Sequence, residues 1–124
     1  MFDIPDYFKD SEFQKVGCSR SDCNPDALSA LNRLRHVCGF PFVLTSAYRS
    51  PYNEQLHGRS TTGPHTTGHA FDVRCVSDNQ RFIIVSLAPQ FGFTRIGIGR
   101  NFVHLDNLAS VPGSKKKPAI WHYY

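Results

Sequence analysis

The chain has 124 residues, of which 40% are hydrophobic and 19% are charged, a composition typical of a globular protein. This length suffices for one hydrophobic core but not for two, so we expect a single domain over residues 1–124. No apolar run approaches the roughly 20 residues of a transmembrane helix. The first ten residues lack the basic flank and apolar stretch of a secretory signal. We therefore expect synthesis in the cytoplasm and no stable membrane association.

The formal net charge is +4, and the clearest basic run is Lys115–Lys117. This run fits either a solvated loop or a segment attracted to a polyanion such as a cell wall. Nucleic acid is not an expected partner, because the other cations are scattered and no aromatic–basic alternation marks a stacking surface.

None of the four cysteines lies in a CxxC pair, which argues against a structural zinc finger. We expect free, mostly buried thiols. The alternative is a Cys18–Cys23 bridge formed in an oxidising space.

A core helix is predicted after Asn24, which can cap it, with Pro25 in the first turn. The apolar residues recur at helical spacing, and Gly39 is placed to end the element. The apolar residues within 42–46 then predict a short buried strand. Residues 47–64 are rich in Gly, Ser, Thr and Pro and predict a long irregular segment, of the kind that is usually functional.

Residues 68–75 alternate between polar and apolar side chains, which predicts a strand with Phe71, Val73 and Cys75 facing the core. Ser77 is expected to cap a second helix that runs to about residue 88 and ends at Pro89. The remaining expectations are a hairpin of strands at 92–98 and 101–107, a loop at 108–118 and an edge strand at 119–124.

Three side chains form a candidate metal centre. His65 lies at the exit of the irregular segment, Asp72 lies in the middle of a predicted strand, and His104 lies in another. Two imidazoles and one carboxylate are donors that zinc accepts in catalytic sites, where a fourth position stays open. If the two strands are neighbours, Asp72 and His104 meet on one face, and Gly68 would let the chain fold His65 back over them.

A family resemblance rests on four segments in order: residues 46–50 (SAYRS), the pattern HxxGxAxD at 65–72, residues 103–106 (VHLD) and Trp121. Together they resemble the zinc D-Ala-D-Ala carboxypeptidase family, in particular its short single-domain branch from bacteriophage lysins and bacterial wall enzymes. Residues 10–13 (DSEF) and the helix end at 34–39 are also similar to that branch.

The resemblance implies an α+β fold in which a small antiparallel sheet cups one Zn²⁺ and two to three helices pack on the sheet. His65, Asp72 and His104 fall on the metal-ligand positions. The motif Tyr48-Arg49 falls where a guanidinium faces substrate, so Arg49 can polarise a carbonyl or hold a carboxylate. Further predicted substrate contacts are Ser46, Tyr48 and Gln55. His69 is expected to point away from the metal.

The general base is the point at which this chain departs from the family. Many longer relatives carry an acidic residue three positions before the last histidine ligand, whereas this chain has Asn101. Asp106 shares a face with His104 and is the preferred candidate for the base, with orientation of a ligand as its alternative role. His122 is the second candidate.

The resulting hypothesis is a monomeric zinc peptidase that hydrolyses peptidoglycan stem peptides, as a carboxypeptidase or an endopeptidase. It would act at the cell wall after release from the cell, or as part of a virion. The alternative is a zinc-stabilised wall-binding module with weak or no catalysis, which the asparagine at position 101 motivates.

Overall fold

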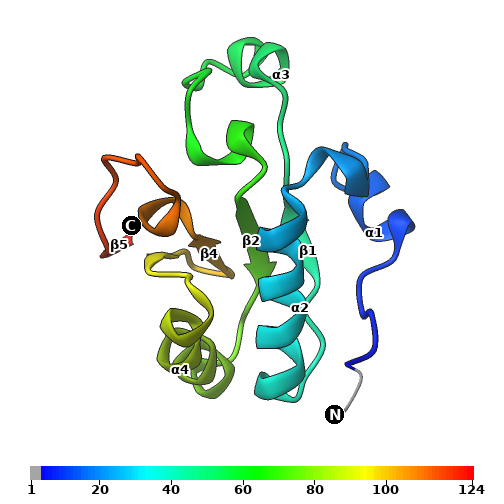
Figure 1. Ribbon diagram of the computed structural model, residues 1–124, viewed down its shortest axis with the longest axis vertical. Coiled ribbons are helices and arrows are strands. Elements are labelled where there is room, and N and C mark those ends of the chain that lie inside the picture. The colour runs from blue at the N-terminus through cyan, green and yellow to red at the C-terminus, as the bar shows by residue number, and fades with distance from the viewer. Residues whose placement is uncertain (1–3) are drawn as a thin grey trace.

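The computed structural model describes residues 4–124, and in it one mixed sheet packs with one face against a layer of helices (Figure 1). Residues 1–3, which belong to the segment in which no secretory signal is expected, lie outside the described residues. The α-helices are α1 (Asp10–Gln14), α2 (Pro25–Cys38), α3 (Pro51–Leu56) and α4 (Asp78–Leu87). Single 3₁₀ turns cover Arg20–Asp22, Pro64–Thr67, Ala88–Phe91 and Leu108–Ser110. No helix within residues 4–124 is long and apolar enough to cross a membrane.

The five strands lie in the order β1-β2-β4-β3-β5. Their bounds are β1 (Leu44–Ser46), β2 (Ala70–Arg74), β3 (Arg95–Ile98), β4 (Phe102–Asp106) and β5 (Ala119–His122). The predicted α+β class, the hairpin of β3 and β4 and the edge strand are confirmed.

The expectation of a wholly antiparallel sheet is wrong at one edge, because β5 pairs in parallel with β3. The chain leaves β4 at Asp106 and enters β5 at Ala119, and both residues lie beside Arg95 at the same end of the sheet. The connection therefore passes over β3 and adds β5 beyond it. Because β3 and β5 both begin at this end of the sheet, they run in the same direction.

The helical layer follows from local signals that the sequence carries. The Asn24 side chain accepts a hydrogen bond from Ala27 N at 3.0 Å, and Gly39 ends α2 in the left-handed region at φ 82°. Apolar residues of α2 and α4 pack against the inward side chains of the sheet: Leu28, Leu31, Leu34, Phe71, Val73, Ile84, Ile96, Val103 and Leu105. Because side chains alternate along a strand, the residues between them face away from the helices.

The predicted irregular segment at residues 47–64 is only partly irregular, since it contains α3. Ser50 caps this helix by accepting a hydrogen bond from Asn53 N, and Pro51 occupies the first turn. This is the same cap-and-proline signal that predicted α2. The sequence analysis also did not foresee α1, whose Phe13 is fully buried in the core.

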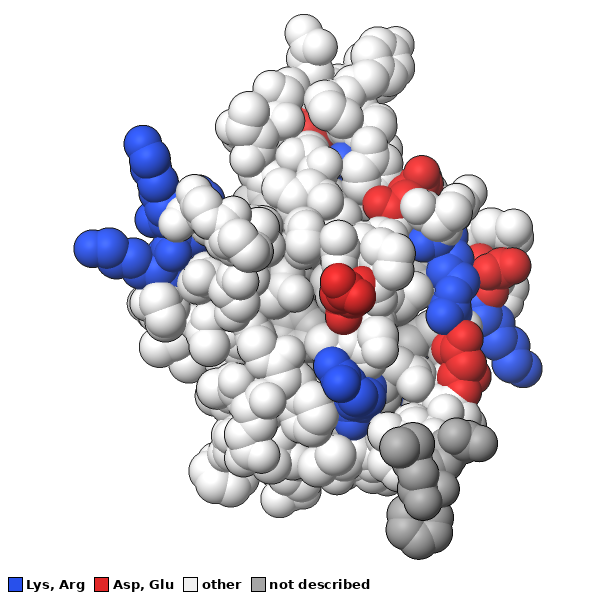
Figure 2. Space-filling model, in the orientation of Figure 1, with Lys and Arg blue, Asp and Glu red and all other residues white. Residues whose placement is uncertain are grey.

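Charge is unevenly distributed over the face drawn in Figure 2. Basic side chains project on the side where the loop before β5 runs, whereas basic and acidic groups are mixed on the side of α1. The structure records all four cysteines as free thiols, with Cys23 and Cys75 buried.

Candidate metal centre

A single row of residues crosses all five strands on the face opposite the helices. Ser46 pairs with Asp72, Asp72 with His104, His104 with Gly97, and Gly97 with Trp121. The predicted adjacency of the strands that carry Asp72 and His104 is therefore confirmed. The row places the two side chains next to each other at the centre of the sheet.

His65 reaches this row from the 3₁₀ turn at Pro64–Thr67, which ends at Gly68 with φ 79°. A Cβ at Gly68 would lie only 2.8 Å from the carbonyl oxygen of Asp22, so the position requires glycine for space as well as for conformation. The Gly68 carbonyl also accepts a hydrogen bond from Asn24 N at 2.9 Å. The turn that presents His65 is thus held against the start of α2.

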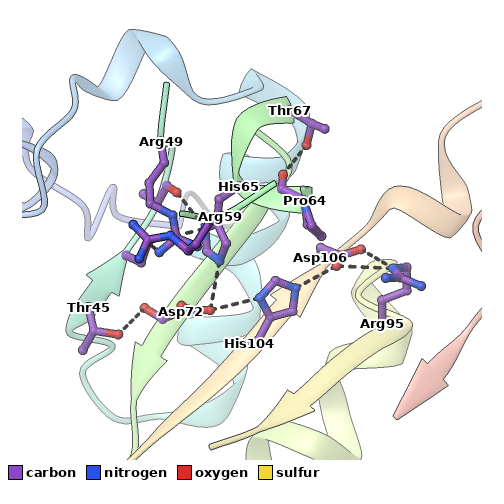
Figure 3. Close-up of polar contacts among 12 residues, drawn as sticks. Thr45, Arg49, Arg59, Pro64, His65, Thr67, Asp72, Arg95, His104 and Asp106 are labelled. Carbon is purple, nitrogen blue, oxygen red and sulfur yellow. Dashed lines mark hydrogen bonds and ion pairs between the residues drawn. The ribbon is translucent and has the colours of Figure 1, made fainter. Parts of the chain in front are cut away.

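The three predicted ligands converge (Figure 3). Asp72 Oδ1 lies 3.2 Å from His65 Nε2 and 3.0 Å from His104 Nδ1. One donor atom from each of the three residues lies within 4.8 Å of the other two. Tetrahedral zinc with bonds of about 2.0–2.1 Å separates its ligand atoms by roughly 3.3 Å. The spacing and the nitrogen and oxygen donors therefore fit zinc.

The outward nitrogens of both imidazoles already have hydrogen-bond acceptors. His65 Nδ1 lies 2.7 Å from the carbonyl oxygen of Ala47, and His104 Nε2 lies 2.7 Å from Asp106 Oδ2. In the neutral form of each ring, which is the form that binds a metal, donation of these N–H groups leaves the lone pairs on His65 Nε2 and His104 Nδ1, the atoms that face Asp72. Such outer partners fix the tautomer and orientation of a metal-binding histidine.

The electrostatics of the row favour a cation. Burial tends to raise the pKa of Asp72, but hydrogen bonds from His104 and His65 outweigh it and hold that pKa well below its usual range. Burial tends to lower the pKa of His104, yet hydrogen bonds to Asp106 and Asp72 outweigh it, so that pKa is raised from 6.5. Asp72 is consequently ionised at neutral pH.

Asp106 lies behind His104 and not in the cavity. Its side chain is 0% exposed. Its Oδ1 forms an ion pair with Arg95 Nε at 3.0 Å and accepts a hydrogen bond from Leu108 N at 3.1 Å. The other carboxylate oxygen accepts from His104. This geometry favours the alternative role of Asp106, orientation of a ligand, over the predicted role of general base.

A second ion-pair cluster lies on the other side of His65 (Figure 3). Arg49 follows β1, and its Nη1 donates to Ser46 Oγ at 2.9 Å. The buried Glu54 of α3 lies 2.9 Å from Arg49 Nε and 3.1 Å from Arg59 Nε. Sequence reasoning did not identify Glu54 or Arg59, although the cap at Ser50 and the proline after it would have placed Glu54 on a helix.

The three candidate ligands and Arg49 border a cavity of about 470 Å³. Its lining residues are Arg49, Pro64, His65, Asp72, Arg95, Phe102, His104, Trp121 and Tyr123. A larger cavity, of about 730 Å³, lies between the N-terminal segment and α2 and contains none of the predicted site residues.

Several other predicted residues are not brought to the cavity. Tyr48 packs against the hydrophobic core, and Gln55 is exposed on α3, so neither lines it. Asn101 is exposed, and its carbonyl accepts from Cys75 N. His122 alternates with Trp121 on β5, is exposed, and has its ring 5.6 Å from that of Tyr124. His69 bonds to Asn107 Oδ1 at 2.9 Å, in agreement with the expectation that it is not a ligand.

Comparison with known families matches residues 2–106 to a model described as Peptidase M15. The matched range contains the three candidate ligands and Arg49, whereas β5 lies beyond it. The comparison with curated proteins finds no significant match.

Proposed function

Because the chain belongs to the peptidase M15 family, we propose that it is a zinc-dependent peptidase that hydrolyses peptide bonds in peptidoglycan stem peptides. The observation that carries the proposal is the convergence of His65, Asp72 and His104 on a cavity that also contains Arg49. Carboxypeptidase and endopeptidase activity on these peptides are both within the proposal. Action at the cell wall after release, or from within a virion, is part of it, as is a monomeric state.

Bound zinc would supply Lewis-acid polarisation of the scissile carbonyl and activation of water. His65 and His104 would hold the ion through Nε2 and Nδ1, and Asp72 would add the negative charge. Asp106 fixes His104 through Nε2 and is itself fixed by Arg95. We assign Asp106 a positioning role on this basis.

Arg49 supplies a fixed positive charge to the cavity. Ser46 and Glu54 hold its guanidinium, so little reorganisation is needed when a negative group arrives. A guanidinium held in this way can stabilise an oxyanion or bind a substrate carboxylate.

The proposal is tested with purified zinc-loaded protein and a panel of stem peptides and whole peptidoglycan, with release of new amine and carboxyl ends followed by mass spectrometry. We expect cleavage that a chelator stops and added Zn²⁺ restores, and a H104A variant that cleaves at less than a hundredth of the rate. A lack of cleavage by the metal-loaded protein on every wall chemistry would refute the enzymatic proposal.

The second candidate is a zinc-stabilised wall-binding module. Among residues 4–124, Asp72 is the only carboxylate that lines the cavity, so this part of the chain places no second acidic group there to accept a proton. Co-sedimentation with insoluble peptidoglycan without any turnover would select this alternative.

A further inference from the structure

One wall of the cavity is built by the end of the chain. Trp121 and Tyr123 both line it, and both lie outside residues 2–106, which match the family. Trp121 pairs with Gly97, and Gly97 pairs with His104 on its other side. The C-terminal strand thus brings two aromatic side chains within one strand of a candidate ligand.

The missing side chain of Gly97 creates the space for these rings. A Cβ there would lie 2.7 Å from Trp121 Nε1 and 2.7 Å from Tyr123 Cε2. The Trp121 ring centre lies 5.4 Å from that of His104, and the Tyr123 ring centre lies 5.2 Å from that of Phe102. The ring of Tyr123 therefore lies over Gly97, which belongs to the row that carries the candidate ligands.

The hydroxyl of Tyr123 is in a suitable state to donate a hydrogen bond. Trp121, whose ring centre lies 6.3 Å from that of Tyr123, offers Nε1 as a donor only and so cannot accept the phenol proton. Tyr123 is about half exposed; its partial burial raises its pKa, and the negative charges of Asp72 and Asp106 raise it as well. The phenol consequently remains protonated at neutral pH.

Within residues 4–124, the two cationic side chains of the cavity do not supply a donor on the β5 side. Arg95 pairs with Asp106 and also donates to the carbonyl of Lys117 at 3.4 Å. Arg49 is held by Ser46 and Glu54 on the β1 side. Tyr123 adds a hydroxyl on the β5 side of the cavity, next to the indole N–H of Trp121.

We propose that Tyr123 is a catalytic residue that donates a hydrogen bond to the oxygen of the scissile carbonyl as negative charge builds on it. The inference rests on the proposed peptidase function. No proton is transferred, and the phenol does not replace the missing carboxylate. It acts as half of an oxyanion site whose other half is Arg49.

The test compares Y123F with wild-type protein and with Y124F, a matched control whose ring lies outside the cavity. Steady-state kinetics, zinc affinity and the affinity for a phosphinate peptide that mimics the tetrahedral geometry are measured on each. We expect Y123F to lower kcat about 100-fold, as loss of one oxyanion donor does. KM and zinc affinity should stay within about threefold, the phosphinate should bind about 100-fold more weakly, and Y124F should match the wild type in all four quantities.

A G97A variant tests the position of the Tyr123 ring without changing Tyr123 itself, because the added methyl group would displace the rings of Trp121 and Tyr123. Its kcat should also fall while zinc stays bound. Fluorescence of Trp121, the single tryptophan of the chain, should report the displacement. The control is G63A, whose Cβ would meet no atom closer than 3.8 Å.

Wild-type cleavage with an equally active Y123F would overturn this inference alone. A change confined to KM, or a loss of zinc from Y123F, would also overturn it, because either result assigns the phenol to ground-state binding or to support of the fold. A wild-type protein that cleaves none of the peptides would overturn the proposed function and this inference with it.

Discussion

Three carboxylates belong to the site, one that lines the cavity and two that lie behind its walls, and their partners assign them different roles. Glu54 pairs with the guanidinium groups of Arg49 and Arg59, and Asp106 pairs with Arg95. Asp72 has only imidazole partners. Because an imidazole is neutral when it binds a metal, Asp72 is the one carboxylate whose charge is left for the ion.

At the residue scale, we predict that E54Q weakens both activity and stability. The variant removes the charge that holds Arg49, and misplacement of such a group costs up to about 100-fold in rate. We expect kcat/KM to fall about 10- to 100-fold and the free energy of unfolding to fall by about 1–3 kcal/mol. Peptide cleavage assays and urea denaturation measure the two effects.

The matched control is E12Q, because Glu12 caps α1 through Lys9 N and does not line the cavity. It should keep kcat/KM within about twofold of the wild type. A destabilised E54Q with unchanged kcat/KM would show that Glu54 supports the fold only.

At the scale of elements, the sheet and the turn before β2 place the candidate ligands. One row across five strands carries Asp72 and His104, and the turn that ends at Gly68 carries His65 over it. The turn is held by backbone contact with the start of α2, where Asn24 N donates to Gly68 O. The position of His65 thus depends on the packing of two segments that lie far apart in the sequence.

We predict that G68A destabilises the protein more than G58A. Both glycines have positive φ, 79° and 69°, so a side chain at either costs about 1–2 kcal/mol in conformational strain. Only at Gly68 would the new Cβ also meet backbone, at 2.8 Å from Asp22 O, whereas no atom lies within 4 Å at Gly58. Overpacking of this kind adds roughly 1–3 kcal/mol.

Urea denaturation of the two variants gives the difference directly, because the strain is common to both. Zinc affinity of G68A should also fall, since His65 moves with the turn. Equal unfolding free energies for G68A and G58A would contradict the close packing of the turn against α2.

At the scale of the whole molecule, metal binding is expected to couple to folding. The ligands come from β2, β4 and a turn between α3 and β2, so the ion would link segments that only the folded chain brings together. An ion that binds the folded state alone stabilises it by about 2.7 kcal/mol at 100 times its dissociation constant.

We predict that this stabilisation by zinc grows as the pH rises. The raised pKa of His104 means that its proton stabilises the metal-free protein at low pH, and that this contribution is lost as pH rises through the folded-state pKa, above 6.5. Zinc competes with the same proton. Thermal unfolding between pH 5.5 and 8.5, with Zn²⁺ or with chelator, should therefore show a widening gap in Tm.

A H104A variant should lose most of the gap at every pH. The exposed His57 provides the control, because H57A leaves the candidate ligands intact. A gap in Tm that narrows as the pH rises would contradict the coupling.

Local patterns were sufficient to predict much of the fold. The cap at Asn24 and the glycine at position 39 gave α2 its ends, and alternation of side chains gave β2 its inward and outward faces. These features depend on neighbours in sequence, so the chain alone carries them. The candidate ligands were found in the same way, from the spacing of His65 and Asp72 and from the family pattern around His104.

Only the tertiary structure decided how distant groups combine. The ion pair of Asp106 with Arg95 joins two strands, the ion pair of Glu54 with Arg49 joins α3 to the segment after β1, and β5 is added in parallel beside β3. Each of these contacts joins different elements of the fold, and no periodic pattern within one element predicts it. The sequence by itself determined which residues could bind a metal. The order of the strands and the path of the loops decided which carboxylate is buried and which aromatic groups close the cavity, because these depend on contacts between segments that local pattern does not relate.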